Sequence, residues 1–165
     1  MLLNVKNGIK MSQNIFVPFF FSLFAGLFYG WIFLEPVEAE IKTIDKIQAL
    51  YSILVRNITC VGTLVITIFI GTIFIKVFYM VNGLVIGLTI SKFQSISYVI
   101  MILPHGLVEI PAFLYLGYIL LKADHANSFN LTTLKGILGS VFLLILGAVI
   151  EAYITPEVVS AIFGS

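Results

Sequence analysis

One histidine and two carboxylates lie within apolar stretches of this chain, where a charged side chain is costly. His105 and Glu109 are four residues apart in MILPHGLVEIPAFLYLGY (residues 101–118), and Glu151 lies near the end of the last apolar run. A charge at the centre of a membrane helix costs at least about 2.5 kcal/mol unless it is neutralised, paired or hydrated. Residues four apart share a helix face, so we predict that His105, Glu109 and Glu151 face the bundle interior together and form a polar network.

Three roles are compatible with the residues of that polar network, and we favour the third, which is structural. A histidine with two carboxylates could ligate a metal and activate water, but the chain has no H-E-x-x-H motif, so we expect no metal, no cofactor and no catalytic residue. A proton or ion pathway would use the same residue types. The third interpretation is a polar lock that fixes helix packing in a non-enzymatic protein whose work is to bind or hold others.

Prolines and a glycine are expected to interrupt the helices around this network. Pro104 suits the first position of a helix because it lacks an N–H, so we predict a break there and a short separate segment before it. Pro111 frees the carbonyl of Leu107 and predicts a kink. Gly106 lies between these two prolines, and Pro156 is expected to end the last span.

The composition identifies an integral membrane protein. Of the 165 residues, 60% are hydrophobic and only 10% are charged, whereas a soluble domain is about a quarter charged. Nine basic and eight acidic residues give a net charge of +1 without a basic run, so nucleic acid is not an expected partner. The only cysteine, Cys60, excludes a disulfide within the chain.

The apolar runs predict an all-α polytopic protein, a single membrane domain over residues 1–165 with about five transmembrane helices. The first run, residues 15–34, is too long for the core of a secretory signal and long enough to cross the membrane, so we expect a retained span. Residues 58–91 are apolar apart from Lys76 and too long for one span, so we divide them near Lys76 and expect a short or re-entrant second element. The expected spans are residues 15–34, 57–75, 77–91, 97–121 and 136–155, with an amphipathic loop helix at about 38–56.

Small residues at a four-residue spacing predict close contacts between helices. Two groups carry this pattern, Gly26 with Gly30, and Asn82 with Gly83 and Gly87. The same surfaces permit a homo-oligomer. Lysines in the first flank and in the loop at 122–135 favour a cytoplasmic N-terminus, in a multi-pass protein of the cell membrane that contacts membrane lipid.

Three strings of this sequence resemble the stage II sporulation protein M family of integral membrane proteins: LPHGLVEIPA at 103–112, GAVIEAYITP at 147–156, and the pair Asn82-Gly83. The likeness extends over about residues 57–156 and includes Arg56-Asn57 at the start of the second span. By matching position, the resemblance places the family signature on Pro104, His105, Gly106, Glu109 and Pro111, with a second block at Glu151, Thr155 and Pro156.

The resemblance implies a bacterial multi-span protein with no established catalytic activity. The namesake looks like a membrane anchor that recruits peptidoglycan-degrading enzymes to the septum of endospore formers, and other members are similar to components encoded beside ATP-binding cassette ATPases. We therefore expect a non-enzymatic membrane subunit that scaffolds or anchors partner proteins, such as cell-wall hydrolases, in a membrane complex. The alternative is the membrane component of an ATP-binding cassette-type export or bacteriocin immunity complex, with a separate ATPase subunit because this chain has no G-x-x-x-x-G-K-[ST] motif.

Overall fold

The computed structural model describes residues 2–35, 45–93, 96–125 and 129–163, and all regular structure within these ranges is helical. Five helical segments in them are long and apolar enough to cross a membrane. The prediction of an all-α polytopic membrane protein with about five spans is therefore confirmed. In chain order the elements are α1 (Leu2–Phe33), α2 (Lys46–Ile70), α3 (Thr72–Ser91), α4 (Ile96–His125), α5 (Leu131–Val149), the π-helical turn η1 (Ile150–Ile154) and α6 (Thr155–Phe163).

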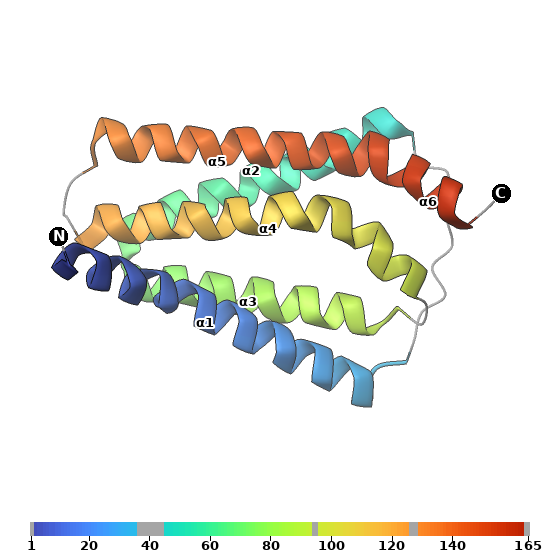
Figure 1. Cartoon of the computed structure of the whole chain (residues 1–165), viewed down its shortest axis with the longest axis horizontal. Coiled ribbons are helices and arrows are strands. Elements are labelled where there is room, and N and C mark those ends of the chain that lie inside the picture. Colours follow the sequence, from blue (N-terminus) through green and yellow to red (C-terminus); the bar gives the residue numbers. More distant parts are fainter. Residues whose placement is uncertain (1, 36–44, 94–95, 126–128, 164–165) are drawn as a thin grey trace.

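The helices form an elongated bundle in which neighbours in the chain run in opposite directions (Figure 1). Helices α1, α3 and α5 run one way, whereas α2 and α4 run the other. The start of α1, the turn between α2 and α3, the end of α4 and the start of α5 lie at one end, which we call the Gly71 end. Helix α6 lies at the opposite end, the α6 end.

The division of the long apolar run falls at Gly71, five residues before the expected position at Lys76. Gly71 alone joins α2 to α3, and its φ of 125° lies in the region that residues with a Cβ rarely adopt. Lys76 lies inside α3. Because α3 has 20 residues, it is about 30 Å long, which is enough to cross a membrane, so the expectation of a short or re-entrant element is wrong.

From residue 46 onward, the expected amphipathic loop helix is part of the second span and not a separate element. Helix α2 begins at Lys46, where the Asp45 side chain accepts a hydrogen bond from the N–H of Ile47 at 3.1 Å and caps the helix. The helix then continues without interruption to Ile70. Residues 46–56 are therefore the first turns of the second span, and residues 36–44 of the expected loop helix lie outside the described residues.

Helix α4 is continuous across Pro104, so the prediction of a broken helix and a separate preceding segment is wrong. A proline inside a helix removes one backbone hydrogen bond and crowds the preceding turn, and a long helix can accommodate both by bending. Figure 1 shows such a bend between the first turns of α4 and its straighter C-terminal part. Gly106 and Pro111 lie within the same continuous helix.

Buried apolar side chains are concentrated towards the Gly71 end. They come from each of the helices α1 to α5, and Tyr79 of α3 is the largest side chain that is fully buried. The Tyr79 hydroxyl donates a hydrogen bond to the carbonyl of Phe113 on α4. Beyond this core, Figure 1 shows α2 and α3 diverging as they leave the Gly71 turn. The main cluster of buried residues is Ile15, Phe19, Leu64, Ile75, Tyr79, Leu114, Leu116, Leu120, Leu121 and Ile137.

Helices α1 and α3 pack with their backbones unusually close. A Cβ built on Gly26 would reach the backbone at Leu84 and Leu88, and one built on Gly87 would overlap the carbonyl of Leu23. Gly83 likewise faces the backbone of α1, and Gly30 faces the side chain of Ser91. The structure thus places all four glycines of the expected packing surfaces in this one contact, where an added methyl group has no room.

Candidate functional site

Glu109 on α4 lies in a polar cluster that is completed by α2. Its side chain is buried, and Asn57 Nδ2 donates a hydrogen bond to Glu109 Oε1 over 2.7 Å. Arg56 Nη2 lies 3.8 Å from the other carboxylate oxygen, Oε2. Because Asn57 is also buried, the amide and the carboxylate satisfy each other across the α2 and α4 interface, which is the arrangement that buried polar groups require.

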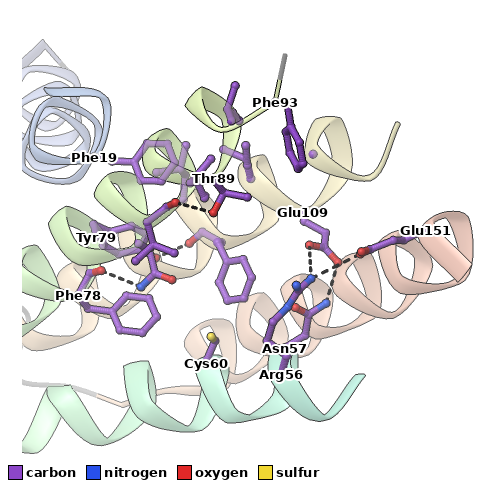
Figure 2. A pocket seen from close by; sticks show the side chains of 18 residues that line it. Phe19, Arg56, Asn57, Cys60, Phe78, Tyr79, Thr89, Phe93, Glu109 and Glu151 are labelled. Atoms are coloured by element: carbon purple, nitrogen blue, oxygen red, sulfur yellow. Dashed lines mark hydrogen bonds and ion pairs between the residues drawn. The ribbon is translucent and has the colours of Figure 1, made fainter. Parts of the chain in front are cut away.

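Glu151 reaches the same cluster from the opposite side through Arg56. Arg56 Nη2 lies 3.5 Å from Glu151 Oε2, so a single guanidinium connects the two carboxylates (Figure 2). The structure therefore brings Glu109 and Glu151 into one cluster, with Arg56 between them. The side chain of His105, the third member of the expected network, lies outside the described residues; its backbone forms part of α4.

Glu151 lies in the π-helical turn η1. The N–H and the hydroxyl of Thr155 both reach the carbonyl of Ile150, five residues earlier, with the hydroxyl at 3.1 Å. Pro156 has no N–H for the carbonyl of Ala152, four residues before it, so one hydrogen bond of the normal helical register cannot form at this point. Wider turns of this kind are rare and occur frequently at functional sites.

Pro156 does not end the last span, contrary to the sequence prediction. It follows Thr155, the first residue of α6, and the helix continues to Phe163. A proline in the first turn of a helical segment is tolerated because its fixed φ suits the helix. The prediction failed because the register change in η1 lets a new helical segment begin directly after the old one.

Gly147 provides the space for Glu109 between α4 and α5. A Cβ on Gly147 would lie 2.7 Å from Glu109 Cγ and 3.4 Å from Oε1. Gly147 was not among the residues singled out from the sequence. The available signal was its place in GAVIEAYITP, one helical turn before Glu151.

Arg56 and Asn57 were also not among the expected members of the network. The sequence predicts a helix outside the membrane core for the polar residues before position 57, so Arg56 is not expected in the network. Its signal was the Arg56-Asn57 pair in the stretch that resembles a known family. In the structure, Arg56 is 15 residues from Gly71 on one helix, hence about 22 Å from the Gly71 end of α2, whose 25 residues measure about 38 Å. The cluster thus lies slightly beyond the middle of α2, on the side of the α6 end.

A second ion pair joins the start of α2 to α6. Lys46 Nζ lies 2.6 Å from Glu157 Oε1, and both side chains are exposed. Exposed pairs of this kind contribute roughly 0 to 1 kcal/mol. Together with Arg56 and Glu151, this pair fastens the first half of α2 to the C-terminal part of the last span.

A cleft of about 400 Å³ adjoins the polar cluster between α2, α3 and α4. Arg56, Asn57, Glu109 and Glu151 line one side of it, and mainly apolar and aromatic side chains line the rest (Figure 2). Asn82, expected to be a packing residue, lines the cleft and donates a hydrogen bond to the carbonyl of Phe78 on its own helix. Cys60 and Thr89 also line the cleft.

The chemistry of the cluster is that of a pairing site. One cation and one amide meet two carboxylates from two other elements. Within the described residues, no three histidine, cysteine, aspartate or glutamate side chains are grouped as metal ligands would be. The expectation that the chain holds no metal stays a prediction, because the side chain of His105 is not among those residues.

A family model described as stage II sporulation protein M matches residues 15–156, which includes every residue of the polar cluster. No curated protein and no solved structure matches the chain.

Proposed function

The chain belongs to the stage II sporulation protein M family, and from that premise we propose that it is a non-enzymatic membrane subunit that anchors partner proteins in a membrane complex. The observation that carries the proposal is the pairing of Glu109 and Glu151 with Arg56 and Asn57. Carboxylates that are bound to a cation and an amide of the same chain fasten helices together. They stabilise one arrangement of the helices, and an anchor needs a bundle of fixed shape.

The described surface of the bundle supports contacts made within the membrane. Helix α2 is joined to α3 by Gly71 alone, so this connection offers no loop to a soluble partner. Helix α1 presents large aromatic side chains on the face turned away from α3, including Phe21, Phe24, Phe28 and Trp31, each more than 60% exposed. Such helix faces can pack against lipid or against the spans of another protein.

The proposal is tested by purifying the tagged full chain in a mild detergent and identifying every companion present in stoichiometric amount. We expect at least one membrane or membrane-associated protein. Cell-wall hydrolases would support a septal anchor, and a stoichiometric ATPase would support the alternative, the membrane component of an export or immunity complex. A chain that purifies alone from its native membrane, at native expression level and in several detergents, would contradict the proposal.

A matched pair of variants makes this experiment specific to a surface. Phe21→Ala combined with Phe24→Ala removes part of the aromatic face of α1, whereas Leu138→Ala combined with Phe142→Ala removes exposed apolar side chains from α5. If α1 holds the partner, the first pair of changes reduces the amount of companion and the second does not. Equal retention by both variants would exclude the α1 face as the anchoring surface.

A further inference from the structure

The Gly71 end of the bundle carries most of the positive charge of the chain. With His125 counted as neutral, its five lysines and one carboxylate, Asp124, give this end a net charge of +4. The rest of the chain has four basic and seven acidic residues, hence a net charge of −3. The bundle is therefore polarised along its length, and anionic groups are attracted to the Gly71 end. The five lysines are Lys6, Lys10, Lys76, Lys122 and Lys135.

A cleft of about 270 Å³, which we call the Lys122 cleft, lies at this end between the C-terminal part of α4 and the first turn of α5 (Figure 1). On α4, Tyr115, Ile119 and Lys122 line it with the spacing of one helix face. A Cβ built on Gly136 would overlap the side chain of Ile119, so the two helices are in contact just beyond the first turn of α5. The cleft is too small for a whole phospholipid, but it has room for a phosphate group and the atoms next to it.

The Lys122 cleft lies at the depth of a membrane face. The membrane-spanning part of α4 ends at Ala123, and that of the last span begins at Leu131. Lys122 lies beside the first of these boundaries, and Asn130, the N-cap of α5, directly precedes the second. Tyr118 lies one helical turn before Lys122, about 6 Å deeper, and tyrosine is enriched at membrane interfaces. The polar side chains of the cleft are thus placed where lipid head groups lie.

The described side chains of the cleft offer one cation and several hydrogen-bond donors, and none of them is acidic. Lys122 is exposed and makes no ion pair within the described part of the chain. Asn130 Oδ1 already accepts hydrogen bonds from the N–H and the hydroxyl of Thr133, at 3.0 and 3.1 Å, which leaves its amide N–H groups to donate. The hydroxyls of Tyr115 and Thr132 have no hydrogen-bond partner among the described residues. A group with several negatively charged oxygens suits these donors.

Asp124, the one carboxylate of the Gly71 end, occupies a position on the opposite side of α4. It follows Lys122 by two residues, which is about 200° around a helix of 3.6 residues per turn. Residues two apart in a helix do not face each other. The backbone of α4 therefore places no carboxylate on the face that lines the cleft, and the charge of that face is positive.

We propose that the Lys122 cleft binds the phosphate of an anionic membrane phospholipid. Lys122 pairs with the phosphate, the hydroxyls of Tyr115 and Thr132 donate hydrogen bonds to it, and the acyl chains stay in the surrounding bilayer. Basic pockets between membrane helices are suited to anionic head groups. The site lies towards the opposite end of the bundle from the polar cluster, and it does not depend on the anchoring role proposed above.

The test measures which lipids remain bound to the purified full chain. The protein is placed in nanodiscs that contain dioleoyl phosphatidylglycerol and dioleoyl phosphatidylcholine in equal amounts, and the lipids retained after release are identified by native mass spectrometry. We expect about a fivefold preference for phosphatidylglycerol, since one lysine near a membrane surface has about this effect on an anionic lipid. Equal retention of the two lipids would overturn the proposal.

Two lysines of the Gly71 end provide a matched pair of variants. Lys122 lines the cleft, whereas Lys76 lies on α3 and does not. Lys122→Gln and Lys76→Gln each remove one positive charge from the same end, but only Lys122→Gln should bring the preference for phosphatidylglycerol close to equality. An equal loss in both variants would show that the preference comes from the overall charge of this end, and it would overturn the site.

A third variant places a negative charge inside the cleft. Thr132 is exposed in the first turn of α5, where a glutamate favours the helix, so Thr132→Glu is expected to fold. It should abolish the preference for phosphatidylglycerol because its carboxylate repels the phosphate. Thermal unfolding establishes that each variant is folded. A full preference in folded Thr132→Glu would contradict the assignment of the head group to this cleft.

Two other occupants give different results in the same assay. If the cleft takes a free phosphate ion, excess inorganic phosphate removes the preference of the wild-type protein, whereas sodium chloride of equal ionic strength does not. If it takes an acidic segment of a partner protein, Lys122→Gln loses a companion protein without any change in bound lipid. Either result would overturn the proposal, while a preference that depends on Lys122 and withstands inorganic phosphate would support it.

Discussion

Arg56 on α2 and Glu151 in the π-helical turn are 95 residues apart in the chain, and their side chains lie 3.5 Å apart. Arg56 also lies 3.8 Å from Glu109. The contact therefore joins three elements that share no turn or loop with one another. It also gives both carboxylates a cation without drawing on any group from outside the chain, which reduces the cost of placing them in an apolar bundle.

Two substitutions of Glu109 should distinguish the stability gained from its hydrogen bond to Asn57 from the effect of burying the side chain. Glu109→Leu leaves the buried amide of Asn57 without its acceptor and should lower the free energy of unfolding by about 1 to 3 kcal/mol. Glu109→Gln keeps an acceptor for Asn57 and should cost less. Thermal unfolding in detergent measures both. The matched control is Glu157→Leu, which breaks an exposed pair with Lys46 and should change stability by less than about 1 kcal/mol; equal stability of all three variants would contradict the polar lock.

Two glycines of α5 should respond differently to the same change. A Cβ on Gly147 would lie 2.7 Å from Glu109 Cγ, whereas a Cβ on Gly139 would meet nothing within 4 Å. Gly147→Ala should destabilise the protein by about 1 to 3 kcal/mol because it crowds the carboxylate. Gly139→Ala should be neutral or stabilising by up to about 1 kcal/mol, since alanine favours the helix. A Gly147→Ala protein that unfolds at the wild-type temperature would show that α4 and α5 are not packed as described.

The contact between α1 and α3 should be sensitive to one added methyl group. A Cβ on Gly87 would overlap backbone atoms of α1 at Leu23 and Leu27, and backbone cannot move aside as a side chain can. Gly87→Ala should therefore reduce the yield of folded protein in detergent and lower its unfolding temperature. Gly62→Ala on α2, where a Cβ meets nothing within 4 Å, is the control. Equal yields from the two variants would rule out close backbone packing of α1 on α3.

Orientation in the membrane can be measured with single cysteines. If the N-terminus is cytoplasmic, α1 and α2 each cross once and return the chain to the cytoplasmic face at the Gly71 end. In a Cys60→Ser background, Thr132→Cys should then be protected from a membrane-impermeant maleimide added to whole cells, and Lys92→Cys should be labelled. Both positions are exposed at the ends of helices. The reverse labelling pattern would place the N-terminus, and with it the Gly71 end, outside.

Local features of the sequence predicted those elements whose stability depends mainly on one type of residue. Long apolar runs can be stable only across a membrane, and the five spans follow from their length. The breaks were harder to place. Lys76 can extend its long side chain from within α3, so a charge did not mark the turn. Gly71 does mark it, because residues with a Cβ rarely adopt its φ of 125°. Pro104 was expected to break a helix that bends instead.

The sequence by itself determined that Glu109 and Glu151 needed partners, because the cost of an unpaired charge among apolar residues does not depend on the fold. Only the tertiary structure decided that Arg56 and Asn57 are partners of these carboxylates and that Gly147 leaves room for the side chain of Glu109. The reason is that a side-chain pair across helices depends on crossing angles, on the divergence of α2 from α3 and on the register change at η1. Each of these arises from the packing of all the spans together, and no local stretch of sequence contains it.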